Sequence, residues 1–409
     1  MSMMSILSKQ SRAEHCPLTL PCAPRKAAAI EQYNWLKGTY ESAPEQQELP
    51  FELIPPDPVW VSAEAEQAVQ LLATDTGAQL LVSGFGLSLG KKSERITIKL
   101  KGKVCGELPL FRVQEIVVMG RGISVSTDLI EEACRRGIRL AFLSPSWKPV
   151  ALLTSPFLTA TVATRRAQLE AAETGIGMDL MRWIVAGKLH NQEKLLRYFG
   201  KSRTGVEKER LVSRATRLRA LRKQALEVEA GTAGDVRSRA MGLEGAGGRE
   251  YWRALAGLLR PELGFQGRVH AQPEDAVNAS LNYGYGILYA HVWGAVMNAG
   301  LEPFAGFLHG DRPGKPSMVL DLVEEFRQPV VDRPLFAWLF KGGTPRLVKG
   351  LLDEESREAV ATRVLTRLNS GEPHRGKNHQ VRSIIQMQAR LAASAVRGLR
   401  DYRPFAFKW

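Results

Sequence analysis

The chain has 409 residues, more than one hydrophobic core usually fills, and 44% of them are hydrophobic, as in globular proteins of two or more domains. Its 56 Lys and Arg outnumber its 42 Asp and Glu, which gives a net charge of +14. This charge favours an acidic polymer or an anionic surface as partner, although a basic enzyme with a solvated surface has the same excess of positive charge. No stretch is apolar for the ~20 residues that a membrane span needs and no secretory core opens the chain, so membrane and secreted classes are excluded and a cytoplasmic protein is expected.

The first predicted segment is an N-terminal extension or linker over residues 1–70. It contains Pro-Cys-Ala-Pro and Ile-Pro-Pro-Asp-Pro, whose prolines interrupt regular structure. A His-Cys pair at residues 15–16, with Cys22 further on, has the composition of half a metal site, but no second half follows at ligand spacing. The other cysteines, Cys105 and Cys134, are too irregularly spaced to indicate a disulfide framework.

A β-rich domain is predicted next, over residues 71–156. Short β-branched or aliphatic runs between Gly-containing turns predict strands at Gln79–Val82, Arg95–Leu100 and Glu115–Val118. The segment Gly84–Ser93 resembles a phosphate-binding loop, but its glycine spacing does not fit that motif, and a hairpin turn is predicted instead.

A short helix and one more strand complete this domain. The helix is predicted at Asp128–Arg136, with Ser126 or Thr127 as its N-terminal cap and Gly137 at its end. The strand follows at Ile138–Leu143. These elements predict a small, mostly β domain.

Helical spacing dominates the rest of the chain, over residues 157–409. Apolar residues such as Ile184 and Leu195 recur there between charged ones. Lys201–Lys223 carries basic side chains on more than one face, as a solvated surface helix and a DNA-facing helix both do. The predicted fold class is therefore α+β, with a small, mostly β N-terminal domain followed by a larger all-α domain.

Two acids and a histidine stand out in the helical domain. Asp321 and Glu324 are three residues apart in a helical pattern, so they are predicted to share one helix face, and His309 precedes them. Two adjacent carboxylates repel unless a cation neutralises them, and a divalent metal with oxygen and imidazole ligands would do so. The same acids could instead complement the helix dipole, so spacing alone leaves both interpretations open.

A further acid, Glu244, lies in a glycine-rich run. The run Gly242–Gly248 lacks the lysine of a phosphate-binding loop and follows no predicted strand, so nucleotide binding there is not expected. Its small residues leave room for another backbone or a DNA strand to approach Glu244 closely.

Several separate segments resemble, in order, the motif series of the CRISPR-associated integrase/endonuclease family of spacer acquisition. The resemblance covers roughly residues 75 to 409 and rests on the number and order of the motifs, not on any single one. The segments that carry it are Leu108–Gly120, Ile123–Ser126, Gly137–Leu143, Arg182–Gln192, Met241–Gly245, Tyr251–Trp252, Asp275–Ala279, Asn282–Tyr285, Tyr402–Phe405 and Trp409, together with Arg165, Gln168, His309, Asp321 and Glu324.

The sequence departs from the family pattern in two places. Ser144–Pro149 replaces a Gly-containing turn, which affects the expected shape of that turn and not the chemistry. Residues 1 to about 70 have no counterpart in the common form. They are a vestige of a fused adaptation protein, a docking tail or a disordered leader.

The resemblance implies a role for each matching residue. Glu244, His309 and Glu324 match the metal-binding residues of the family, and Asp321 matches an acid that supports the catalytic site. Two carboxylates and one imidazole suit Mg²⁺ or Mn²⁺ better than structural zinc. The all-α domain is then the catalytic domain, and the β-rich domain is the dimerisation domain.

The implied activity is insertion of protospacer DNA into a CRISPR array. DNA 3′-OH ends would attack phosphodiesters of the repeat, and water as the nucleophile would cleave DNA at the same site. Arg249, Lys315 and Arg327 are the expected phosphate contacts, while Tyr283 and Tyr285 either hold a DNA end or belong to the core.

The resemblance also implies partners, and alternatives remain open. The expected partners are double-stranded DNA, a second copy of the chain and the small second CRISPR adaptation protein, with no membrane. One alternative is a stand-alone metal-dependent nuclease for branched DNA. The other is a non-catalytic DNA-binding scaffold in which the metal is structural.

Overall fold

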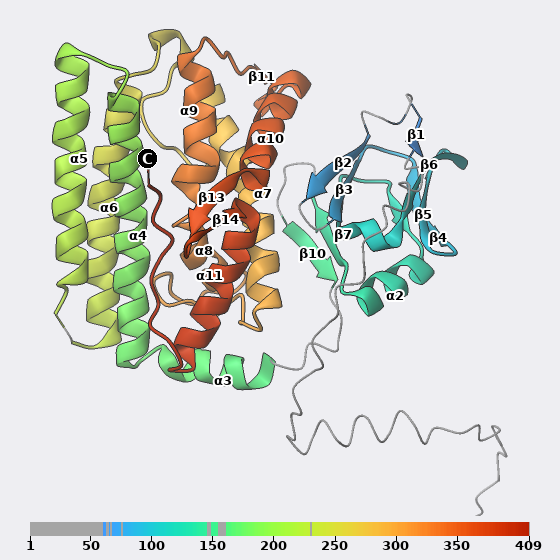
Figure 1. Ribbon diagram of the computed structural model, residues 1–409. Coiled ribbons are helices and arrows are strands. Elements are labelled where there is room, and N and C mark those ends of the chain that lie inside the picture. The colour runs from blue at the N-terminus through green and yellow to red at the C-terminus, as the bar shows by residue number, and fades with distance from the viewer. Residues whose placement is uncertain are drawn as a thin grey trace, which may run out of the picture. The chain divides into compact units, whose positions relative to one another are not determined.

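The computed structural model describes residues 60–62, 65, 68–74, 77–144, 149–153, 161–229 and 231–408 (Figure 1). A strand-rich region comes first and a helical region follows, so the α+β division predicted from the sequence is compatible with the structure. None of the helices in these ranges is both long and apolar enough to cross a membrane. The predicted metal half-site at residues 15–16 and Cys22, and most of the predicted extension, lie outside the described residues.

Two five-stranded sheets form the strand-rich region. Their strands are β1 (Trp60–Val61), β2 (Val69–Thr74), β3 (Gly77–Ser83), β4 (Leu87–Lys92), β5 (Arg95–Leu100), β6 (Lys103–Pro109), β7 (Val113–Met119), β8 (Ser124–Val125), β9 (Arg139–Leu143) and β10 (Pro149–Leu153). One sheet has the order β1-β6-β5-β4-β8 and the other the order β10-β9-β7-β3-β2. Within the second sheet, β3, β7 and β9 run parallel to one another.

Apolar side chains of the two sheets form one buried cluster. Leu80, Ile116 and Leu140 stand side by side on the parallel strands and are fully buried. Leu89 and Ile98 are paired across β4 and β5 and are also buried. Burial of such aliphatic side chains is the main source of stability in this region.

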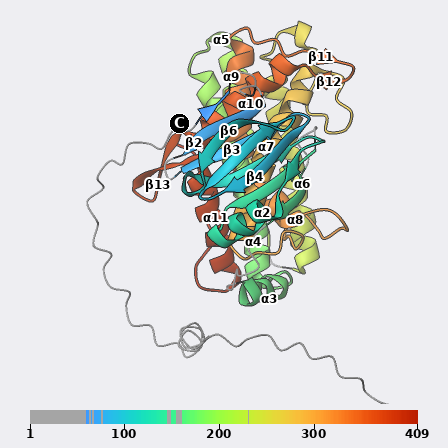
Figure 2. The same cartoon turned by 90° about the vertical axis from the view of Figure 1, so that its right-hand side faces the viewer.

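Helix α2 (Thr127–Arg136) lies beside the strands (Figure 2). The hydroxyl of Ser126 accepts a hydrogen bond from the Leu129 backbone N–H at 3.3 Å, and Gly137 ends the helix with a left-handed φ of 71°. Leu129 is fully buried, which fixes the helix to the cluster between the sheets. Both predicted ends of this helix are confirmed.

The strand predictions agree with the structure apart from two points. The predicted runs correspond to β3, β5, β7 and β9. However, Gly84–Ser93 is not a single hairpin turn, because residues 87–92 pair with β5 as strand β4 and only residues 84–86 connect β3 to β4. Strands also begin at Trp60, before the predicted boundary at residue 71. Most of the unusual turn at residues 144–149 lies outside the described residues.

The helical region contains the helices α3 (Thr161–Ala171), α4 (Gly175–Gly200), α5 (Gly205–Leu226), α6 (Ala233–Ala256), α7 (Ala276–Asn298), α8 (Ser317–Val323), α9 (Arg333–Phe340), α10 (Glu354–Asn369) and α11 (Val381–Val396), with a π-helix at Gln328–Asp332. The long helices α4, α5 and α6 lie side by side (Figure 1). Two short hairpins also occur, β11 (Leu347–Val348) with β12 (Leu351–Leu352) and β13 (Gly371–His374) with β14 (Lys377–Gln380). The region is therefore mostly helical, and the all-α prediction was wrong at these hairpins.

Local signals fix where the helices that carry the site begin. The Thr232 side chain accepts a hydrogen bond from the Asp235 backbone N–H, and the Asp235 carboxylate accepts one from the Thr232 backbone N–H, which forms a capping box at the start of α6. Asp275 caps α7 by accepting a hydrogen bond from the Asn278 backbone N–H at 2.7 Å. Helix α4 is mostly buried along its length, and its buried residues include the polar Lys188, Asn191, Gln192 and Glu193.

The helix predicted to carry both Asp321 and Glu324 is interrupted. Helix α8 ends at Val323, residues 324–326 form turns, and a π-helix follows at Gln328–Asp332. Pro329 has no backbone N–H, so regular helical hydrogen bonding cannot continue through it. Asp321 therefore lies inside α8, whereas Glu324 caps its C-terminal end with helical φ and ψ of −60° and −33°.

Candidate active site

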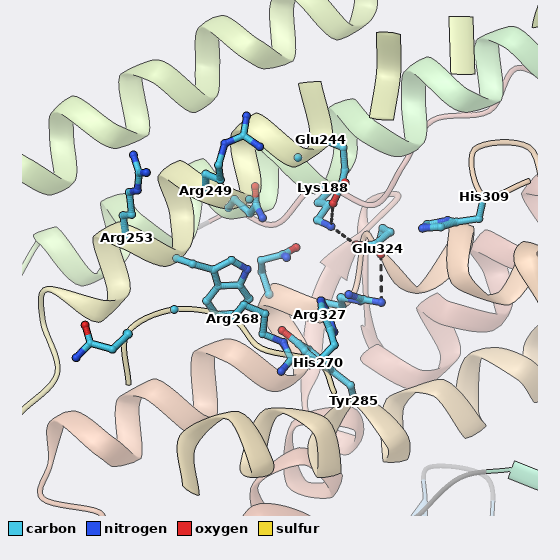
Figure 3. Close-up of a pocket in the computed structure, with 17 residues that line it drawn as sticks. Lys188, Glu244, Arg249, Arg253, Arg268, His270, Tyr285, His309, Glu324 and Arg327 are labelled. Atoms are coloured by element: carbon cyan, nitrogen blue, oxygen red, sulfur yellow. Dashed lines mark hydrogen bonds and ion pairs between the residues drawn. The ribbon is translucent and has the colours of Figure 1, made fainter. Parts of the chain in front are cut away.

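A cavity of about 490 Å³ lies within the helical region, lined by residues from α4, α6 and α7 and from the segments before and after α8 (Figure 3). Both acidic and basic side chains reach it. Its lining comprises Lys188, Gln192, Glu244, Gly245, Gly248, Arg249, Trp252, Arg253, Gln266, Gly267, Arg268, His270, Tyr285, His309, Glu324, Arg327 and Gln328.

Lys188 links the two carboxylates of this cavity. Its ammonium forms an ion pair with the carboxylate of Glu244 and lies 2.6 Å from Glu324 Oε2 (Figure 3). The other oxygen of Glu324, Oε1, lies 3.2 Å from the guanidinium of Arg327. The side chain of Glu324 is only 3% exposed, so these charges interact with little screening by water.

The pKa values of these groups reflect the pairing. Burial acts to raise the pKa of Glu324, but Arg327 and Lys188 outweigh it and hold this pKa at about 2. Burial likewise acts to lower the pKa of Lys188, and the charges of Glu324 and Glu244 raise it above the ordinary value. Glu324 is therefore ionised and Lys188 is charged at neutral pH.

Asp321 holds the segment that carries His309. Its Oδ2 accepts hydrogen bonds from the backbone N–H groups of Phe307 and Leu308 at 2.6 and 3.0 Å. Its Oδ1 accepts one from the His309 backbone N–H at 2.9 Å and lies 2.7 Å from His309 Nδ1. With Nδ1 occupied by the carboxylate, the imidazole has Nε2 left to bind a ligand.

Two arginines of the cavity stack on Tyr285. The guanidinium carbons of Arg268 and Arg327 lie 5.3 and 5.0 Å from the centre of its ring. The Tyr285 hydroxyl donates a hydrogen bond of 2.5 Å to Asp332, which also accepts one of 2.8 Å from Tyr251. Burial raises the pKa of Asp332 to about 6, although both tyrosine hydrogen bonds act to lower it. The buried tyrosines thus fix the position of the two arginines.

The C-terminal segment Tyr402–Phe407 is bound next to the catalytic candidates. Glu325, the residue after Glu324, accepts hydrogen bonds from the Tyr402 hydroxyl at 2.7 Å and from the Phe405 backbone N–H. The Asn191 side chain donates hydrogen bonds to the carbonyl oxygens of Glu325 and Phe405 at 2.7 and 3.1 Å and accepts one from the Phe407 N–H at 3.1 Å. This segment therefore ties the backbone around Glu324 to helix α4.

The donor set of the cavity fits a hard divalent cation. Glu244, Glu324 and the free Nε2 of His309 supply two carboxylates and one imidazole, which suit Mg²⁺ or Mn²⁺. Among the residues that the structure describes, no three acid, imidazole or thiol groups come close enough to form a metal site as they stand. The ammonium of Lys188 lies between the two carboxylates and supplies the positive charge there.

The structure brings most of the predicted site residues together. Six of them line the cavity: Glu244, Arg249, Tyr285, His309, Glu324 and Arg327. Asp321 lies behind His309 and does not line the cavity, in keeping with a supporting role. Lys315 and Tyr283 are not among its lining residues, so the structure does not bring these two to the site.

Sequence reasoning missed several residues of the cavity. Lys188 was part of a motif that carried the resemblance, but it received no role, although a lysine within an apolar helix is itself a signal of a buried partner. Arg268 had no distinguishing pattern around it. It is held by the side-chain oxygens of Asn278 at 3.0 Å and Asn282 at 2.5 Å, which only the fold brings together.

Comparisons with known proteins identify the family of the chain. A family model described as CRISPR associated protein Cas1 matches residues 80–364. The chain is 33% identical over 346 residues to a protein of Archaeoglobus fulgidus named CRISPR-associated endonuclease Cas1 1, which covers 81% of this chain and 100% of that protein.

Solved structures with the same fold are also found. One described as a casposase bound to integration product is similar with a TM-score of 0.65 at 19% identity, over 81% of this chain and 94% of that chain. Another, described as a Cas6-RT-Cas1–Cas2 complex, is similar with a TM-score of 0.66 at 18% identity, over 82% of this chain and 37% of that chain. At these identities the structures show the fold.

Proposed function

Because the chain belongs to the CRISPR-associated Cas1 family, we propose that it is a metal-dependent DNA integrase and endonuclease that inserts protospacer DNA into a CRISPR array. In this reaction the 3′-OH ends of the incoming DNA attack phosphodiesters of the repeat. The observation that carries the proposal is that Glu244, His309 and Glu324 line the same cavity as four arginine side chains.

The arginines of the cavity are suited to hold DNA phosphates. Arg268 and Arg327 are fixed by the ring of Tyr285, so their guanidinium groups are oriented before a substrate arrives. Arg249 and Arg253 project from the exposed side of α6 along the same cavity (Figure 3). Fixed positive charge of this kind stabilises the negative charge that spreads over the phosphoryl oxygens during transfer.

The acidic residues and the histidine are assigned to the metal. Glu244, Glu324 and His309 Nε2 would hold Mg²⁺ or Mn²⁺, with the imidazole oriented by Asp321. When bound, the ion would polarise the phosphoryl oxygen and make the attacking hydroxyl easier to deprotonate. Lys188 pairs with both carboxylates, and its ammonium, which lines the same cavity, would donate to a phosphate bound there.

The proposal includes partners and a location. Double-stranded DNA is supported by the basic side chains of the cavity and by the similar structure described as a casposase bound to integration product. A small second adaptation protein is supported by the similar structure that is described as a complex containing Cas1 and Cas2. We also expect a homodimer formed through the strand-rich region, whose sheets have edge strands to cover, and action in the cytoplasm, where the array lies.

The test is an integration assay with purified protein. A short duplex with free 3′-OH ends is incubated with supercoiled target DNA and Mn²⁺, and gels are read for joined and nicked products. The proposal expects joined product, and a matched duplex with 3′-dideoxy ends should give none, because it lacks the attacking hydroxyl. Nicking without joining would favour the stand-alone nuclease, and DNA binding without either product would favour the scaffold.

A further inference from the structure

Helix α6 contains interior glycines that the packing of the protein does not require, and two of them, Gly245 and Gly248, line the cavity. A Cβ atom added at Gly248 would meet no atom within 4 Å, and one added at Gly245 would meet only the end of the Arg249 side chain at 3.7 Å. Gly247 is different, because its Cβ would come within 2.1 Å of Leu189 on α4. Glycine weakens a helix interior relative to alanine, so Gly245 and Gly248 weaken α6 at positions where a side chain would fit.

Both glycines lie beside the catalytic candidates. Gly248 is four residues after Glu244, and Gly245 is four residues before Arg249, so each is one helical turn from a charged side chain of the cavity. Both line the cavity itself. No side chain therefore covers the backbone of α6 at Gly245 and Gly248, between an acidic and a basic group. We call Gly245 and Gly248 the glycine strip.

Buried polar atoms in the same cavity indicate a ligand. Gln192 and Gln328 are each only 1% exposed, both line the cavity, and their Oε1 atoms find no hydrogen-bond partner among the described residues. A buried acceptor without a donor is costly unless a bound molecule supplies the donor. DNA carries donors of this kind in its terminal hydroxyl and in the N–H groups of its bases.

The charge of the cavity indicates the chemistry of that ligand. Four guanidinium groups line it, and Arg249 and Arg253, both exposed, form no ion pair with any described residue. Unpaired arginines in a row match the repeated phosphates of a nucleic-acid strand. A bare helix surface beside them allows a sugar–phosphate backbone to reach van der Waals contact with the helix backbone.

We propose that one DNA strand crosses helix α6 at the glycine strip, in direct contact with its backbone, with its phosphates directed toward Arg249 and Arg253 and its reacting group toward Glu244. This inference rests on the proposed function, since it specifies how the substrate enters the same cavity. It assigns the glycine strip a role in binding and positioning the DNA strand through the helix backbone, in addition to the contacts of the charged side chains.

The test uses alanine substitutions in the full chain. Gly245→Ala, Gly248→Ala and the double variant are compared with Gly242→Ala, a third glycine of α6 whose Cβ would meet nothing within 4 Å but which does not line the cavity. All of them should keep or raise the Tm, because alanine favours the helix. The double variant should join DNA about 10- to 100-fold more slowly, since displacing a bound strand by about 1 Å has effects of this size. Gly242→Ala should join DNA like the wild type.

Binding is measured in parallel, with EDTA present, using a fluorescent duplex with single-stranded 3′ ends. Weaker binding by the double variant, but not by Gly242→Ala, is expected. Unchanged joining and binding in a stable double variant would overturn the inference, and so would a loss of activity that follows a lowered Tm. Loss of joining with unchanged DNA binding and impaired association of protein subunits would overturn it in favour of a protein contact. If the wild type joins no DNA, the proposed function fails, while the binding difference still decides the role of the strip.

Discussion

Lys188 Nζ lies 2.6 Å from Glu324 Oε2, and this ion pair is almost closed to water because the two side chains are 9% and 3% exposed. The ammonium also pairs with Glu244, so the two carboxylates assigned to the metal share one lysine. The position of a bound cation and the position of this ammonium are therefore coupled.

The first prediction follows from that coupling. Lys188→Met should destabilise the metal-free protein by about 3–5 kcal/mol, because it leaves two carboxylates without their shared cation. Mn²⁺ should raise the Tm of this variant more than that of the wild type, since a bound ion replaces the lost charge. The measurement is a melting curve with Mn²⁺ and with EDTA, and Lys194→Met on the same helix is the control. An equal response to Mn²⁺ in all three proteins would contradict the metal assignment.

A second prediction concerns Glu324 itself. Glu324→Ala should reduce joining and cleavage by orders of magnitude while DNA affinity persists, because affinity comes from the arginines of the cavity. Melting curves, binding isotherms and joining assays are made on one preparation. Glu209→Ala, an exposed acid of α5, should behave like the wild type. Retained joining in a well-folded Glu324→Ala protein would contradict the assignment of Glu324 as a catalytic residue.

A third prediction separates the roles of His309 and Asp321. His309→Ala should remove most joining with little loss of stability, since the imidazole is only partly buried. Asp321→Asn should lower stability by about 1–3 kcal/mol, because an amide cannot accept the hydrogen bonds from the backbone at residues 307–309 with both of its ends. It should also slow joining by about 10- to 100-fold through the misplaced imidazole. If both variants lost activity only in proportion to their unfolded fraction, the two residues would be structural.

The fourth prediction concerns pH. The pKa of Asp332 in the folded chain is about 6, above the ordinary 3.8, so its contribution to stability is present below about pH 3.8 and is lost as the pH rises through about 6. Tyr251→Phe removes a hydrogen bond to the charged form, so the destabilisation should be larger at pH 8 than at pH 5. Urea unfolding at the two pH values measures this, and Tyr289→Phe on α7 is the control. The same loss at both pH values would mean that Asp332 stays protonated throughout.

A fifth prediction concerns electrostatic binding. Affinity for unrelated duplexes should be similar and should fall linearly with salt on a log–log plot. Arg249→Ala combined with Arg253→Ala should reduce the slope by about 2, since each phosphate contact contributes about 1. Arg397→Ala, an exposed arginine after α11, should leave the slope unchanged. A slope unaffected by the double variant would place the DNA elsewhere on the protein.

Local patterns predicted much of the fold. The β-branched and aliphatic run Arg95–Leu100 and the cap residues Ser126 and Gly137 act within a few residues of chain, so the strand β5 and both ends of α2 were predicted from the sequence. The hairpins of the helical region were missed, because β13 and β14 carry polar and charged residues and lack the apolar alternation of a half-buried strand.

The site was predictable only in part, for a related reason. Glu244, His309 and Glu324 were assigned through motifs, and the structure brings them to one cavity. The partner of Lys188 and the stacking of Arg268 on Tyr285 depend on how α4, α6 and α7 pack, which no pattern within one segment specifies. The contact of Asp321 with the backbone behind His309 likewise depends on how the segment before α8 folds back onto the helix.

The hydrogen bonds between Tyr402–Phe407 and the pair Glu325 and Asn191 have a consequence for biosynthesis. During translation, helix α4 and the residues around Glu324 leave the ribosome before this segment exists. Until it is made, Glu325 and Asn191 lack their hydrogen bonds to Tyr402, Phe405 and Phe407, which leaves the backbone around Glu324 less firmly held. A chain shortened before Tyr402 by early termination or proteolysis should therefore join and cleave less DNA than the full chain.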